Sequence, residues 1–477
     1  MRVDSYNSSP YDEEEFNPNI WLKEKASELG VPAKNLHVLA AHRDPFNKGT
    51  KGDWVKGKWF KEMHDRFGYD QMHLRRLHYR MVNAEEAVYS WDGSLYENDQ
   101  KHWGHLGEAF ITARILGLVD AGGFVDRRVQ ASRIDGMCAN VMPEPEFSAE
   151  PPYFNDLPDA PGRFIPGISR VNLFSFGMSD PRFEVTGYNY DSSLQPNLVE
   201  IWSEKSGDDR VLRGIANHYG INYQPGIGYA SITNIKRMLK RVADHGKPAR
   251  ILYVSDFDDA GNNMPVQVGR HSQFSAWELE ELAYSEAPDI MIDDIALTAE
   301  QVEELNLPPI PGTDKREIDA LEALHPGKLR EYVTNRVKEL LDPDLEDRVG
   351  QAEEDARQAV KNELDAIMDE HRERLEEIRV ETQEIVNRYN RFYRILGEKV
   401  ADRYQKLQDR YERHVVGLRE DLEREQEEIR EAIESLDIDL PAIPEGEVDT
   451  PRDGWLFDSE REFLDQTIRF RRAQRKE

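Results

Sequence analysis

The sequence predicts a mixed fold, in which an α/β domain built on a parallel sheet is followed by a long helical arm. Two apolar runs predict the sheet: residues 198–203 (LVEIWS) and residues 251–254 (ILYV), each followed closely by acidic residues. Such runs are typical of buried parallel strands that deliver a loop at their carboxyl ends. From about residue 345 to residue 436 the composition shifts to Glu, Arg, Gln and Asp, which predicts the arm.

Composition limits the class of protein. A chain of 477 residues with 39% hydrophobic residues is long enough for two or three domains, and no apolar run reaches membrane-spanning length. The single Cys138 excludes an internal disulfide. The net charge of −30 argues against binding nucleic acid by overall charge. We expect a cytoplasmic, nucleoid-associated protein with no membrane partner. The acidity resembles proteins of salt-loving archaea, although an acidic C-terminal helix explains much of it.

Acidic residues follow both predicted strands. Asp256 and Asp258 come two residues apart after the second run, and Glu204 follows the first. Carboxyl ends of parallel strands meet at one edge of a sheet, where ligands bind in open α/β folds. Hard oxygen ligands of this kind suit Mg²⁺. The alternative for Asp256 and Asp258 is an acidic turn that caps the next helix.

This arrangement resembles the TOPRIM half of the topoisomerase VI A subunit and of its relative, the meiotic double-strand-break transesterase. Residues 226–242 and residues 306–329 also resemble segments of that family. The resemblance implies a Rossmann-like parallel sheet over residues 195–341. It also implies that Glu204, Asp256 and Asp258 hold Mg²⁺, or Mn²⁺, beside DNA.

A helix over residues 73–82 (HLRRLHYRMV) carries the second resemblance. Its segment Arg75-Arg76-Leu77-His78-Tyr79 resembles the family's R-x-x-Y-Y pattern, with His78 in place of the first Tyr. The resemblance implies a winged-helix domain over residues 36–141, with Tyr79 as the nucleophile and Arg75 and Arg76 beside it. The alternative is an ordinary helical Tyr at the edge of a core.

Basic residues near this helix are candidate DNA contacts. We expect a strand at residues 36–41, a Gly/Lys loop at residues 42–54, and a strand with a basic wing at residues 124–133. Lysines interleaved with aromatic residues are typical of phosphate-contacting surfaces, although solvated side chains are the alternative for each. The candidate DNA-binding residues are Lys51, Lys56, Lys58, Arg80, Arg127 and Arg128.

The remaining segments connect or extend these domains. We expect a disordered or short helical N-terminus at residues 1–35 and an irregular linker at residues 142–194. Apolar residues at steps of three, four and seven predict a coiled coil over residues 345–438. About 70 residues of continuous helix would reach on the order of 100 Å. We interpret it as a dimerising or partner-binding arm. Residues 439–477 are expected to form a linker and a basic helix. The basic tip of that helix is expected to be a solvated tail, with a second phosphate contact as the alternative.

Together the resemblances imply a type IIB topoisomerase-like DNA transesterase, similar to stand-alone A-like proteins of archaeal, bacterial and viral mobile elements. It would form a phosphotyrosyl link to double-stranded DNA through Tyr79 and act as a homodimer. No ATP-binding motif is visible, so strand passage would need an ATPase partner subunit. Two alternatives remain: a hydrolytic TOPRIM nuclease, and a non-catalytic DNA-bridging coiled-coil protein.

Overall fold

The structure is a computed structural model that describes residues 17–69, 72–119, 124, 144–154, 157, 179–205, 207, 209–226, 228, 230–281, 288–395 and 401–475. The chain forms two compact units. The sheet unit contains Met1–Asn140, Asp191–Pro343 and Glu445–Glu477, and the hairpin unit contains Val141–Tyr190 and Asp344–Pro444. The expected mixed α/β class is present, with a largely parallel sheet and two long helices.

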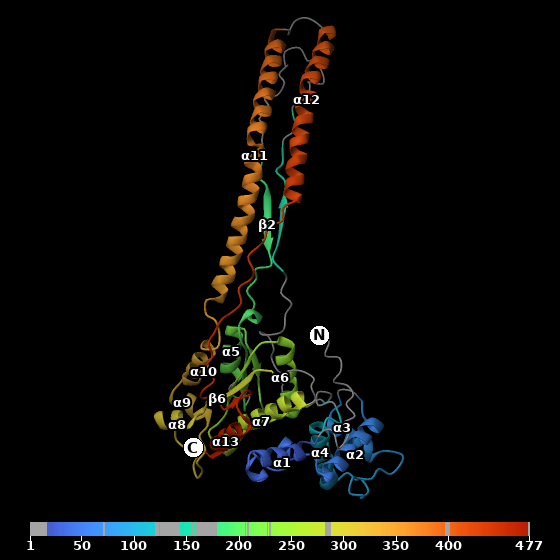
Figure 1. Ribbon diagram of the computed structural model, residues 1–477, viewed down its shortest axis with the longest axis vertical. Helices are drawn as coiled ribbons and strands as arrows, with labels where there is room; N and C mark the ends of the chain where they lie inside the picture. Colours follow the sequence, from blue (N-terminus) through green and yellow to red (C-terminus); the bar gives the residue numbers. More distant parts are fainter. Residues whose placement is uncertain are drawn as a thin grey trace. The chain divides into compact units, whose positions relative to one another are not determined.

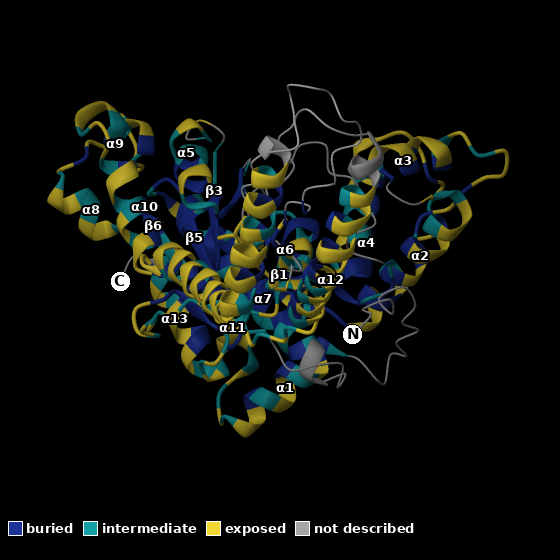
Figure 2. Ribbon diagram, turned by 90° about the horizontal axis from the view of Figure 1, so that it is seen from above, coloured by how far each residue is buried: buried dark blue, intermediate teal, exposed yellow. Residues whose placement is uncertain are grey.

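A five-stranded sheet with the order β4-β3-β5-β6-β7 forms the centre of the sheet unit. Its four parallel strands are β3 (Leu198–Ser203), β4 (Asn222–Gln224), β5 (Ala249–Val254) and β6 (Ile290–Ala296). Every residue of β3 and β5 is buried (Figure 2). Burial along the whole strand is expected when helices cover both faces of a parallel sheet.

Six helices and one short 3-10 turn accompany these strands in the chain. These elements are η3 (Ser192–Leu194), α5 (Asp209–Tyr219), α6 (Ile232–His245), α7 (Asp259–Glu281), α8 (Ala299–Glu304), α9 (Ile318–Leu324) and α10 (Lys328–Lys338). Four of the helices, α5, α6, α7 and α10, are long enough to cover the sheet. Thr298 and Gln301 form a capping box at the start of α8.

The C-terminal segment belongs to the sheet unit, so the expected solvated tail is wrong. Strand β7 (Phe457–Asp458) pairs antiparallel with β6, and α13 (Phe463–Arg475) packs on α7. Phe457 and Phe470 are buried in the core. The basic end is also engaged, because Arg471 donates to the carbonyl oxygen of Lys34 (2.9 Å). Burial of these aromatic rings outweighs the polar composition of the segment.

The N-terminal part of the sheet unit is helical. Residues 36–41 form no strand; Asp44 holds them instead, by accepting from the backbone N–H of Val38 (2.8 Å). The expected loop ends early because Thr50 and Asp53 form a capping box, which places Lys51 at the start of a helix. The elements are α1 (Pro18–Glu28), η1 (Ala33–Asn35), η2 (Pro45–Asn47), α2 (Lys51–Phe67), α3 (Leu74–Val82) and α4 (Gln100–Ile115).

The hairpin unit corrects the expectation of one continuous helix. Helices α11 (Leu345–Ile395) and α12 (Ala401–Glu434) run side by side (Figure 1). They are antiparallel, because Arg374 pairs with Asp421 (2.7 Å) and the later Tyr389 meets the earlier His414 (3.0 Å). The apolar seam therefore closes within one chain.

Two strands accompany the helical hairpin. Strands β1 (Glu146–Glu150) and β2 (Arg182–Thr186) pair antiparallel, so the segment expected to be an irregular linker contains regular structure. Both strands contact the hairpin, β2 at α11 and β1 at α12. The short alternating strands and the residues between them gave no clear period in the sequence.

Candidate functional site

The carboxyl edge of the parallel sheet brings acidic residues from two strands together. Ser203 ends β3 and pairs in register with Val254, which ends β5, so the following residues start at one level. The backbone N–H of Glu204 donates to the carbonyl oxygen of Val254 (2.9 Å). In return, the backbone N–H of Asp256 donates to Glu204 Oε2 (3.0 Å). The two loops are thus locked to each other directly beneath the acids.

Asp258 is fixed by the start of α7. Its Oδ1 accepts from the backbone N–H groups of Ala260 (2.8 Å) and Gly261 (2.7 Å), which is the capping role that the sequence allowed. The loop turns so tightly that a Cβ on Gly261 would lie 1.9 Å from the carbonyl oxygen of Asp256. Only glycine fits there. Capping leaves Oδ2 of Asp258 for a cation.

In both Asp carboxylates, one oxygen accepts from backbone N–H groups and the other contacts a lysine. Asp256 Oδ1 accepts from the backbone N–H of Ile318 (3.0 Å), while its Oδ2 contacts the Lys205 ammonium. Asp258 Oδ2 pairs with Lys315 Nζ (2.8 Å). The backbone therefore orients one oxygen of each Asp, and the other oxygen of each already faces a positive charge.

The electrostatics differ between the acids. Burial, followed by the charges of Asp256 and Asp258, raises the pKa of Glu204 above its ordinary value. Burial also acts to raise the pKa of Asp258, but Lys315 and the backbone N–H groups outweigh it and lower the pKa. Glu204 consequently gains most from a cation placed among the three.

Sequence reasoning missed a fourth acid, Asp294 on β6. Its Oδ1 is buried and has no hydrogen-bond partner among the described residues. Burial, then the charges of Asp293 and Glu204, raises its pKa well above the ordinary value. The signal was available in the sequence, because two acids interrupt the otherwise apolar run IMIDDIAL. Lys205 and Lys315 carried no such signal, since surface lysines are common in loops.

The donor set at this edge fits a hydrated Mg²⁺ ion. All the donors are carboxylate oxygens, and Mg²⁺ is usually held by one or two carboxylates while it keeps several waters. The acids do not form a closed cluster. Within the described ranges, the one group of three His, Asp or Glu ligand atoms within 4.8 Å of one another is His371, Glu425 and Glu428, in the hairpin unit.

Tyr79 lies on α3, a helix whose apolar residues Leu77 and Met81 belong to a different hydrophobic cluster from the sheet. Its side chain is 50% exposed. The neighbouring His78 is buried instead, where its ring nitrogens meet Tyr96 Oη (2.8 Å) and Asn98 Oδ1 (3.0 Å). These contacts fix the rotation of α3, so that Tyr79 faces outward.

The arginines around Tyr79 each have a partner in the folded chain. Arg75 lies 5.7 Å from the centre of the Trp103 ring. Arg76 donates to Tyr69 Oη (2.7 Å). Arg80 donates to the carbonyl oxygen of Phe67 (2.7 Å). These contacts use only part of each guanidinium, which has five N–H donors.

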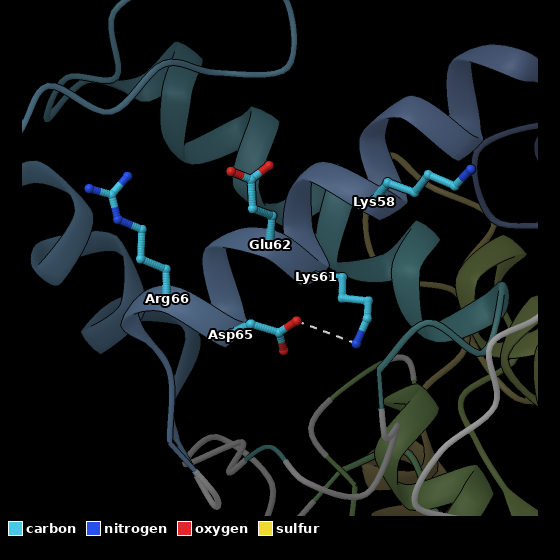
Figure 3. Close-up of a pocket in the computed structure, with 5 residues that line it drawn as sticks. All are labelled: Lys58, Lys61, Glu62, Asp65 and Arg66. Atoms are coloured by element: carbon cyan, nitrogen blue, oxygen red, sulfur yellow. Dashed lines mark ion pairs between the residues drawn. The ribbon is translucent and has the colours of Figure 1, made fainter.

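The three candidate lysines, Lys51, Lys56 and Lys58, all lie on α2. Lys51 and Lys58 are exposed, whereas Lys56 is half-buried against Glu108 (2.6 Å). A hollow on α2 is lined by basic and acidic side chains, among them Lys61 and Asp65, which form an ion pair (3.4 Å) (Figure 3). Arg127 and Arg128 lie outside the described residues. The surface of α2 is therefore mixed in charge.

No protein-family model matches the chain, and no curated protein is significantly similar to it. In the part of the chain that the structure describes, none of the helices has the length and apolar character needed to cross a membrane.

Proposed function

We propose that the chain is a Mg²⁺-dependent enzyme that cleaves double-stranded DNA through Tyr79, as its resemblance to the topoisomerase VI A subunit implies. The proposal joins a winged-helix domain carrying Tyr79 to a TOPRIM domain carrying the acids. One observation carries it: Glu204 and the loop of Asp256 and Asp258 interlock at the carboxyl edge of adjacent parallel strands. This is where α/β folds bind ligands.

The chemistry is a transesterification. The Tyr79 oxygen attacks the phosphorus of a phosphodiester, a new P–O bond forms, and the bond to the leaving deoxyribose oxygen breaks. The phenol proton leaves and the released hydroxyl gains one, so the step is balanced without water. Arg75 and Arg76, one turn earlier on α3, would hold the phosphate. A Mg²⁺ ion at the acids would stabilise charge on the phosphate and orient the strand.

We also propose that the protein acts as a homodimer. Tyr79 lies on α3, which packs with α2 and α4, and the acids follow strands of the sheet core. In the family that the chain resembles, the Tyr of one protomer meets the metal of its partner. Two such sites would cut both strands of a duplex.

The test is a denaturing gel of protein incubated with end-labelled duplex and Mg²⁺. Wild type is expected to give a protein-linked DNA band, and Tyr79→Phe to abolish it, because only the nucleophilic oxygen is lost. Tyr89→Phe is the matched control, since Tyr89 is similarly exposed, at 58%. Cleavage without any adduct in wild type would contradict the transesterase.

A hydrolytic nuclease is the second candidate. The hydrogen bonds that hold the acids come from the loops after the strands, from α7 and from Lys315. A site assembled in this way is able to position a water molecule independently of Tyr79. Under this alternative, Tyr79→Phe cuts DNA at the wild-type rate and the products carry no protein.

A further inference from the structure

The hairpin unit contains a mixed histidine–carboxylate cluster that the proposed DNA chemistry does not use. His371 lies on α11, and Glu425 and Glu428 lie three residues apart on α12. Their ligand atoms all lie within 4.8 Å of one another. His371 Nδ1 is 2.9 Å from Glu425 Oε2, and both side chains are nearly buried, at 13% and 12% exposure. Two helices therefore contribute to one small polar site.

The charges around the cluster are paired among themselves. Arg374 and Arg424 both bind Asp421, at 2.7 Å each. Arg430 pairs with Glu427. These arginines on both helices thus pair with other acids, and among the described residues no cation is found on Glu428. The cluster holds two carboxylates and an imidazole with no permanent positive charge of its own.

We propose that this cluster binds Zn²⁺ and fixes the register of α11 against α12. Imidazole with carboxylates is a common zinc donor set, and three protein ligands leave a fourth position for water. Glu428 is exposed, so water reaches that position. Mg²⁺ disfavours imidazole, so the two metals are separated: Mg²⁺ suits the all-carboxylate sheet edge and Zn²⁺ suits the hairpin.

The geometry requires only a small adjustment. Tetrahedral Zn²⁺ with bonds of 2.0–2.2 Å places neighbouring ligand atoms roughly 3.3–3.6 Å apart. The existing hydrogen bond between His371 and Glu425, at 2.9 Å, is a little shorter. Zn²⁺ in its place would separate the two atoms by a few tenths of an ångström, and the hydrogen-bonding proton would be released to solvent.

The experiment measures Zn²⁺ binding to the metal-free full-length protein by equilibrium dialysis, with millimolar Mg²⁺ present to fill the hard-oxygen sites. Wild type is expected to bind one tight equivalent that His371→Gln lacks. Loss of a direct ligand should weaken binding by more than the roughly 10–100-fold that follows loss of an outer-shell partner. Co²⁺ in place of Zn²⁺ should give tetrahedral visible absorption in wild type but not in His371→Gln.

Two further variants keep the test decisive. Glu428→Gln alters an exposed residue, so the hairpin stays folded, and it should weaken Zn²⁺ binding. His414→Gln is the matched control, because His414 is also a histidine that contacts the opposite helix, at Tyr389 Oη (3.0 Å). Equal Zn²⁺ binding by wild type, His371→Gln and Glu428→Gln would overturn the proposal. So would an equal loss of binding in His414→Gln.

Discussion

At the scale of a single residue, Asp294 shows how an acidic group at the sheet edge lowers the stability of the folded protein. Its pKa is raised by burial, by Asp293 and by Glu204, so the folded chain binds a proton that the unfolded chain releases. A raised carboxyl pKa lowers stability as pH increases from the ordinary value, about 3.9, toward the folded value. Asp294 lies near Glu204 in spite of this loss of stability. Its presence there is consistent with a site where a bound cation offsets the negative charges.

We predict that Asp294→Asn is more stable than wild type at pH 8 in the presence of a chelator. The amide cannot ionise, so the variant escapes the deprotonation penalty. Near pH 4 the advantage should vanish, because wild type is then largely protonated in the folded state and only partly charged when unfolded. Thermal unfolding at both pH values measures this. Asp319→Asn, at an exposed site, is the control. An equal gain at both pH values would refute the account of Asp294.

The ion pair between Asp44 and Arg270 is the residue-scale contact that ties the N-terminal segment to α7. Both side chains are fully buried, 3.2 Å apart. Arg270 also donates to the carbonyl oxygen of Leu36 (2.8 Å). Burial acts to raise the pKa of Asp44, yet Arg270 and backbone N–H groups outweigh it, so the pKa is lowered.

Asp44→Ala should therefore lower the free energy of unfolding by about 3–5 kcal/mol, because it leaves the Arg270 charge buried and unpaired. Glu331→Ala removes an exposed pair with Lys328 and should change the free energy of unfolding far less, because solvent screens that pair. Urea unfolding at neutral pH compares the two variants. Similar values for both would show that the buried pair contributes little.

At the scale of elements, some features follow from local sequence and others do not. The strands before Glu204 and Asp256 were predictable from local sequence. In each case the apolar run indicates a buried strand, and the acidic residues after it indicate where the strand ends. The fold-back of the helical arm was not. A heptad seam predicts that a helix packs on a second helix, but it does not indicate whether the second helix belongs to the same chain.

The site was predictable in the same partial way. The positions of Glu204, Asp256 and Asp258 followed from the strand ends. Their partners Lys205 and Lys315 did not, because Lys315 reaches Asp258 across 57 positions of the chain. Strand β7 has only two residues, too few for any period to appear. Both features depend on contacts between residues that are distant in sequence, which a local sequence pattern does not predict.

The return of the chain through β7 and α13 predicts how the protein tolerates deletion. Truncation after Pro343 removes Trp455, Phe457 and Phe470 from the core, so the sheet unit should unfold or aggregate. Removal of residues 366–431, with a short Gly/Ser bridge, should leave it folded, because the deleted parts of α11 and α12 pair with each other. Circular dichroism and thermal unfolding of both variants test this. A sheet unit that survives truncation equally well would contradict the structural role of the C-terminus.

At the scale of the whole molecule, the net charge of −30 governs how any cation acts. Self-repulsion destabilises a compact acidic chain, and any salt relieves part of it by screening. A specific Mg²⁺ effect is visible only against a constant ionic strength. The control must also keep the overall charge close to that of wild type, which a substitution of two carboxylates does.

The central claim is that Glu204, Asp256 and Asp258 form a divalent-ion site at the sheet edge. The most direct measurement is a melting titration with Mg²⁺ at constant, high ionic strength, on wild type and on Asp256→Asn with Asp258→Asn. Wild type should gain about 2.7 kcal/mol when Mg²⁺ is about 100-fold above its Kd. The double variant should gain nothing from Mg²⁺. Equal shifts of the melting temperature in the two proteins would contradict the claim.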